Sequence, residues 1–97
     1  MATIEQRIYN GDRAREVLEN EAFEQAFTDI KTELIEQWTN SPVRDLDGRE
    51  KLYQLLKLAD KLKANLQTSL ETGKLARLDL AHEESVLQKA KRAVGLT

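Results

Sequence analysis

The chain has 97 residues, which predicts one domain, and a chain of this size buries only about 60–65% of the surface that its unfolded form exposes. One Pro, four Gly, 40% hydrophobic and 33% charged residues are typical of a folded helical protein. Without Cys the chain cannot form disulfides or thiolate metal sites, and its single His excludes a multi-histidine metal site.

The N-terminal part contains two candidate helix starts. The Asn-Gly-Asp stretch at 10–12 predicts a turn, with Asp12 as the N-cap of a helix over about 12–19. Asn20 is a second candidate N-cap and would begin a helix over 21–39. The pattern is therefore compatible with two helices or with one bent helix.

The segment 21–39 has one apolar face, and Pro42 marks its end because proline disfavours helical geometry at the residue before it. Large apolar side chains recur there at spacings of three and four, as expected for an amphipathic helix. They are Phe23, Phe27, Ile30, Leu34 and Trp38.

A longer helix is predicted over about 48–72, with Asp45 or Asp47 as its N-cap and Gly73 as a left-handed residue just beyond its end. Its apolar positions form a nearly heptad-spaced seam. The seam comprises Leu52, Leu55, Leu56, Ala59, Leu62, Leu66, Ser69 and Leu70.

The segment after Gly73 has a different pattern. Leu75, Leu78 and Leu80 come closer to alternation than to helical spacing, so we expect a connector there. A short final helix is predicted over 83–94, whose apolar face needs a surface to dock on because helices this short are marginal alone. This face comprises Val86, Leu87, Ala90 and Val94.

These elements predict an all-α single domain over 1–97: an antiparallel helical hairpin with short flanking N- and C-terminal helices. The helix over 48–72 would be about 37 Å long and the helix over 21–39 about 28 Å long. The unmatched length must be covered by a flanking segment or by another chain, so we expect a homo-oligomer.

Charge is divided along the chain. Residues 1–47 carry eleven acidic and five basic residues, a net charge of −6, whereas residues 48–97 carry ten basic and six acidic residues, a net charge of +4. This division favours pairing between the two halves, within one chain or between chains. Exposed pairs contribute only about 0.2–1 kcal/mol each, so charge selects partner and register more than it stabilises.

The end of the predicted hairpin is rich in aromatic, Arg and Asp residues, which suggests a docking surface for a partner. In the competing interpretation Phe23, Phe27, Trp38 and Tyr53 are core residues, and the charged residues only cap helices. The interaction surface at this end comprises Trp38, Arg44, Asp45, Arg49 and Tyr53, and seam residues Leu62, Leu66 and Leu70 extend it.

Neither catalysis nor a cofactor is expected. His82 has no recognisable nucleophile or acid partner, and most acidic residues lie outside the apolar stripes. Phosphates could be contacted by Lys57, Lys61 and Lys63 and by the basic cluster at 89–92. Nucleic acid is nevertheless the less favoured partner, because the pI is 5.4 and the sequence has no helix-turn-helix pattern. No apolar run approaches the roughly 18 residues that span a membrane, so no membrane association is expected.

The chain contains the segments RAREVLEN (13–20), SPVRD (41–45), GREKLY (48–53) and ETGKLA (71–76), together with Lys57. Taken together, these segments resemble a group of small helical proteins encoded by tailed bacteriophages and prophages. The resemblance covers about residues 12 to 76. It implies a non-catalytic structural or assembly role, because such genes lie among virion and packaging genes, with copies of itself or other phage structural proteins as partners. The location expected is then the bacterial cytoplasm or the virion, and the alternative is a small phage regulator that binds a host protein or nucleic acid.

Overall fold

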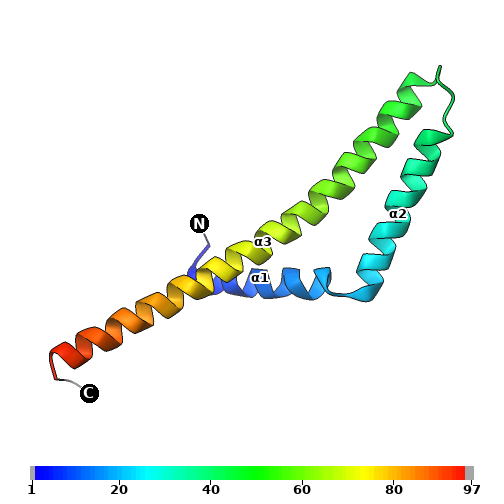
Figure 1. The fold of residues 1–97 in the computed structure, drawn as a ribbon. Helices are drawn as coiled ribbons and strands as arrows, with labels where there is room; N and C mark the ends of the chain where they lie inside the picture. Colours follow the sequence, from blue (N-terminus) through cyan, green and yellow to red (C-terminus); the bar gives the residue numbers. More distant parts are fainter. Residues whose placement is uncertain (1, 96–97) are drawn as a thin grey trace.

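The computed structural model describes residues 2–95, and within them every regular element is an α-helix. The helices are α1 (Ile4–Leu18), α2 (Glu21–Thr39) and α3 (Leu46–Ala93). Residues 2–95 contain no strand, so the all-α prediction is confirmed. The molecule is elongated: α2 lies beside the first half of α3, α1 meets α3 near its middle, and the last part of α3 extends alone toward the C-terminus (Figure 1).

Helix α1 begins eight residues earlier than the predicted start at Asp12. Thr3 and Gln6 form a capping box, in which the Thr3 hydroxyl accepts from the Gln6 N–H and the Gln6 side chain accepts from the Thr3 N–H. The predicted turn at 10–12 was wrong because these residues lie inside the helix. Gly11 is buried there, and Asp12 pairs with another helix.

Helix α2 has the predicted bounds, and the alternative of one bent helix over the first two segments is excluded. The Asn20 side chain accepts a hydrogen bond of 3.0 Å from the Phe23 N–H and begins a new helix there. The rings of Phe23 and Phe27 stack one turn apart, with centroids 6.1 Å apart. Both rings are half-buried.

Helix α3 is one continuous helix of 48 residues, about 72 Å long. The predicted end at residues 72–73, the connector at 75–80 and the separate helix over 83–94 were therefore wrong. Gly73 keeps helical geometry inside α3, and the positive φ expected at Gly73 occurs instead at Gly95, just beyond the C-cap. Of the two candidate caps, Asp45 is the one used: its side chain accepts from the Gly48 N–H at 3.0 Å.

Small residues explain why the chain continues through Gly73. In residues 2–95 the buried positions are Gly11, Ala14, Gly73 and Ala76, two on α1 and two on α3. A Cβ added to Gly73 would lie 2.9 Å from the Gly11 Cα and 3.1 Å from the Arg7 carbonyl oxygen, so the two backbones are in direct contact. This packing offsets the cost of about 1 kcal/mol that glycine adds inside a helix.

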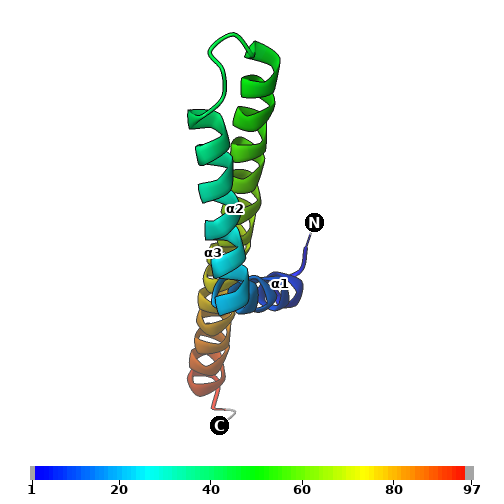
Figure 2. The same cartoon turned by 90° about the vertical axis from the view of Figure 1, so that its right-hand side faces the viewer.

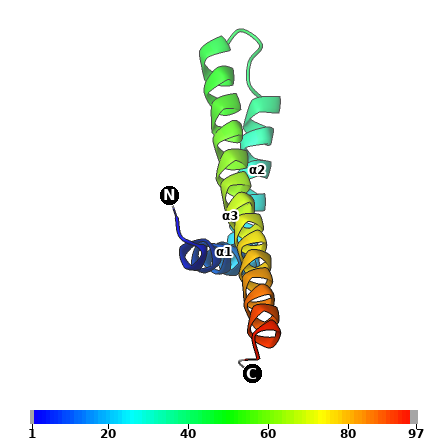
Figure 3. The same cartoon turned by 90° about the vertical axis from the view of Figure 1, so that its left-hand side faces the viewer.

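The shape is far from that of a compact domain of this length. Its extents are 77 × 25 × 16 Å, and its radius of gyration is 21.8 Å, whereas a compact chain of about 100 residues would have a radius of gyration of about 13 Å. Views turned by 90° show α1 projecting to one side of α3, whereas α2 stays in line with it (Figure 2 and Figure 3).

Candidate interaction surfaces

The loop end of the molecule joins Trp38 of α2 to the start of α3. The Arg49 guanidinium lies over the Trp38 ring, 4.8 Å from its centroid. The Ser41 hydroxyl donates to the Trp38 carbonyl oxygen at 2.6 Å, and Asp45 caps α3. The connection between α2 and α3 is thus held by one cation–π contact, by these two hydrogen bonds that involve side chains, and by backbone hydrogen bonds within the turn.

The structure unites only part of the predicted loop-end surface. Trp38 and Arg49 are in contact, but Asp45 is used as a cap, and Arg44 is simply exposed. Tyr53 lies beneath the Lys57 ammonium, which is 5.4 Å from the ring centroid. The interpretation of Trp38 and Tyr53 as core residues was wrong, because they are 41% and 54% exposed.

An apolar groove runs between α2 and the first half of α3. Its volume is about 460 Å³. Of the predicted seam residues, Leu62 lies in this groove and is 54% exposed, whereas Leu66 and Leu70 are half-buried. We call this surface the groove; its lining residues are Ile30, Leu34, Leu55, Leu58, Ala59 and Leu62.

Sequence reasoning did not include Ile30, Leu34, Leu55, Leu58 and Ala59 among the interaction residues. Four of them belong to the predicted apolar faces, and we expected those faces to be buried against each other. Leu58 lies outside the expected seam, and its 62% exposure is visible only once α2 is placed. The sequence did contain a signal for this surface. The long helix carries more leucines than one shorter partner helix can cover.

A second apolar surface lies beyond α1, on residues 78–94, which we call the overhang; it comprises the last part of α3 and its C-cap, Val94. A hollow of about 450 Å³ on the overhang is lined by His82, Glu83, Val86, Leu87 and Ala90. Val86 and Leu87 are 52% and 57% exposed. His82, the only imidazole, is exposed at the edge of this hollow.

Both surfaces include residues of one continued seam. Beyond the predicted seam, the same heptad positions of α3 pass through small residues beneath α1 and become apolar again in the overhang. Glu83 is the one charged residue on this row. The full row is Leu52, Leu55, Ala59, Leu62, Leu66, Ser69, Gly73, Ala76, Leu80, Glu83, Leu87, Ala90 and Val94.

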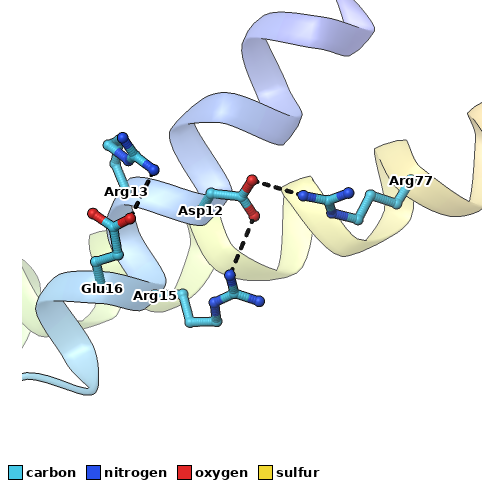
Figure 4. A network of polar contacts seen from close by, with 5 residues as sticks. All are labelled: Asp12, Arg13, Arg15, Glu16 and Arg77. Carbon is cyan, nitrogen blue, oxygen red and sulfur yellow. Dashed lines mark hydrogen bonds and ion pairs between the residues drawn. The ribbon is translucent and has the colours of Figure 1, made fainter.

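A polar network fixes α1 on α3 beside the small-residue contact (Figure 4). The Arg77 guanidinium donates to the Asp12 carboxylate at 2.6 Å, and Arg15 approaches the other carboxylate oxygen at 3.8 Å. The hydrogen bond from Arg77 holds the pKa of Asp12 below its ordinary value of 3.8. On the outer side of α1, Arg13 pairs with Glu16 at 2.7 Å.

A matching ion pair joins α2 to α3. The Lys31 ammonium lies 2.8 Å from the Asp60 carboxylate, and its hydrogen bond lowers the pKa of Asp60. The Phe27 ring lies between two ammonium groups, 5.7 Å from that of Lys31 and 4.9 Å from that of Lys63. These contacts place residue 31 of α2 at the level of residue 60 of α3, with the two helices running in opposite directions (Figure 1).

The described residues provide no cluster of three or more His, Cys, Asp or Glu side chains suited to holding a metal ion. Within residues 2–95, none of the helices has a long enough apolar stretch to cross a membrane. Comparisons with protein-family models, with curated proteins and with solved structures gave no match.

Proposed function

We propose that this chain is a non-catalytic structural or assembly protein of a tailed phage or prophage, which acts through helix–helix contacts with copies of itself or with other phage structural proteins. In this proposal α2 and the first half of α3 act as an antiparallel helical hairpin that presents the groove. The phage assignment is supported only by the sequence resemblance described above.

The observation that carries the interaction role is the lack of a core in the single chain. Among residues 2–95, Ala14 and Ala76 are the buried hydrophobic residues, and sixteen large hydrophobic residues are exposed. Burying one Leu or Val side chain fully contributes about 1.5–3 kcal/mol. Two buried alanines and a set of half-buried larger side chains offset little of the conformational entropy lost on ordering three helices, which supports covering further apolar surface by association.

Surface area leads to the same conclusion. The chain exposes 7859 Å², whereas a compact monomer of this mass exposes about 5,700 Å². The difference, roughly 2,000 Å², exceeds the roughly 800 Å² per partner that a standard protein–protein interface buries. The excess surface is therefore large enough for a stable interface.

The test is the mass of the purified full-length chain, measured by light scattering and sedimentation over a dilution series, with helicity followed by circular dichroism. We expect a multiple of 11.1 kDa, and helicity that falls together with the mass on dilution. A monomer that keeps its helicity at every dilution would contradict the interaction role. Abundance of the chain in purified phage particles would support the structural role, and its absence from them would count against it.

A second candidate function is that of a small phage regulator that binds a host protein or nucleic acid. The observation that favours its nucleic-acid form is the exposed basic cluster of Lys89, Lys91 and Arg92 near the free end of α3. Retention on DNA or RNA that weakens steeply with salt would support this alternative. Lack of retention at low salt would exclude its nucleic-acid form.

A further inference from the structure

The groove and the overhang are two separate apolar surfaces of similar length on one molecule. The overhang is about 26 Å long, and α2, which forms one wall of the groove, is about 28 Å long. Within one chain they cannot meet, because both surfaces lie on the same continuous helix α3.

We propose that the groove of one copy is occupied by the overhang of a second copy, which runs antiparallel to the α3 helix that it contacts. This proposal rests on the self-association proposed above and adds its contact surfaces and its direction. Because each copy carries both surfaces, docking is reciprocal and closes a pair with two-fold symmetry. Each overhang then forms the third helix of a bundle with α2 and α3 of the other copy.

The spacing of apolar residues supports this arrangement. Along the groove, Leu55, Leu58 and Leu62 are separated by three and four residues. In the reverse direction along the overhang, Ala90 and Leu87 are also separated by three residues. The next position, four residues further on, is the charged Glu83, which lies opposite Leu62. Antiparallel alignment places Leu87 opposite Leu58 and Ala90 opposite Leu55, so side chains of one helix enter spaces between side chains of the other.

Charge decides the direction. In the antiparallel alignment Leu87 lies opposite Leu58, so exposed Glu84 of one copy lies opposite exposed Lys61 of the other. In a parallel alignment through the same leucines, Lys61 would instead lie among the basic residues of the 89–92 cluster. Like charges on neighbouring side chains repel each other and destabilise the contact, so the antiparallel direction is favoured.

Helix α2 adds a second complementary contact. Since Lys31 contacts Asp60 and the helices run in opposite directions, exposed Glu36 lies at about the level of residue 55 of α3. The antiparallel overhang brings exposed Lys91 to the same level. Helix α2 carries five acidic residues and one basic residue, so its edge of the groove favours the basic end of the overhang.

The experiment uses three full-length variants with the same change on α3. Leu58→Asp alters the groove, Leu87→Asp alters the overhang, and Leu75→Asp is the matched control at a 61% exposed leucine outside both surfaces. Expected are at least tenfold weaker self-association for the first two variants in sedimentation, and no change for the control. An equimolar mixture of the Leu58→Asp and Leu87→Asp variants should form mixed pairs, because one intact groove and one intact overhang remain.

Any other result of this sedimentation experiment overturns the proposal, and each result identifies a different alternative. Loss of association only for Leu87→Asp would mean that overhangs pair with overhangs, and loss only for Leu58→Asp would mean that grooves pair with grooves. A wild-type oligomer that neither variant weakens would refute the docking alone. A monomeric wild-type chain would refute both the docking and the proposed function.

A charge exchange tests the direction with little risk to folding, since both positions are exposed. Lys61→Glu and Glu84→Lys should each weaken association by about twofold to fivefold, and the variant with both changes should recover it. In a parallel arrangement Lys61→Glu would strengthen association, because it would face the basic cluster. Strengthening by Lys61→Glu, or no recovery in the double variant, would reject the antiparallel docking.

Discussion

The two contacts that α3 makes within the chain are built from side chains of opposite size. At α1 the buried residues are glycine and alanine, and the Gly11 and Gly73 backbones touch. At α2 the contact consists of large apolar side chains and an ion pair, and Leu58 and Leu62 remain more than half exposed. The first contact is complete in one chain, whereas the second leaves a groove.

Close packing and burial of apolar area are therefore separate contributions to the stability of this chain. Glycine and alanine allow two backbones to approach and position α1, but they remove little apolar area from water. The leucines carry most of the available apolar area, and in a single chain much of it stays in water. A fold with this division can be well defined in shape and still depend on a partner for stability.

The largest effect is expected where the backbones touch. Gly73→Ala should destabilise the chain by about 1–3 kcal/mol, because the new Cβ would lie 2.9 Å from the Gly11 Cα and force α1 away. Thermal unfolding at fixed protein concentration measures this change. The sign of the change in unfolding free energy distinguishes the two cases. At an unconstrained helix position, alanine would stabilise the chain by about 1 kcal/mol relative to glycine. The control Ala81→Gly, at an exposed position of α3, reports that propensity alone.

A charge in the groove tests the other contact. Leu62→Asp should cost about 1–3 kcal/mol of association, because it removes apolar area and places an unpaired carboxylate in the covered groove. Leu62 is 54% exposed in the single chain, so the variant should still form its helices. We therefore expect a lower oligomer mass than for the wild type, but a similar helicity at high protein concentration. Sedimentation and circular dichroism of the same samples measure both. Unchanged mass and helicity would show that the seam is not used.

The cap that begins α3 should have a smaller effect, near the loop end of the second contact. Asp45→Ala should cost about 1 kcal/mol, because the Gly48 N–H loses its acceptor. Asp47→Ala is the matched control, since Asp47 lies in the same turn but does not cap. Chemical denaturation of the two variants checks the difference. Equal losses would mean that negative charge, rather than the cap, is responsible.

The smallest effect concerns the ion pairs that accompany the two contacts. The pKa values of Asp12 and Asp60 are lowered in the folded chain by hydrogen bonds from Arg77 and Lys31, so their contribution to stability is present above the ordinary carboxyl pKa. It is lost as the pH falls through the lowered values. The wild type should therefore lose more stability on acidification than the Asp12→Asn, Asp60→Asn double variant. Thermal unfolding of both proteins at several pH values measures this difference. An equal loss of stability in the wild type and in the double variant would contradict the prediction.

Features that depend on neighbouring residues were predictable from the sequence. The bounds of α2 follow from the Asn20 cap and the stop before Pro42, and Asp45 was one of two expected caps for α3. The all-helical character follows from composition and from apolar spacing of three and four. These features were predictable because a cap or an amphipathic face acts within a few residues of the chain.

The roles of residues whose partners are distant in sequence became clear once the helices were placed in space. Asp12 was expected to cap a helix and instead binds Arg77, and Gly73 was expected to end a helix and instead contacts Gly11. Glycine at position 73 suits a helix end and a close helix crossing equally well, and nothing within one turn of the chain distinguishes them. The physical reason is that a side chain's role depends on what it contacts, and these contacts form only when α1 folds across α3.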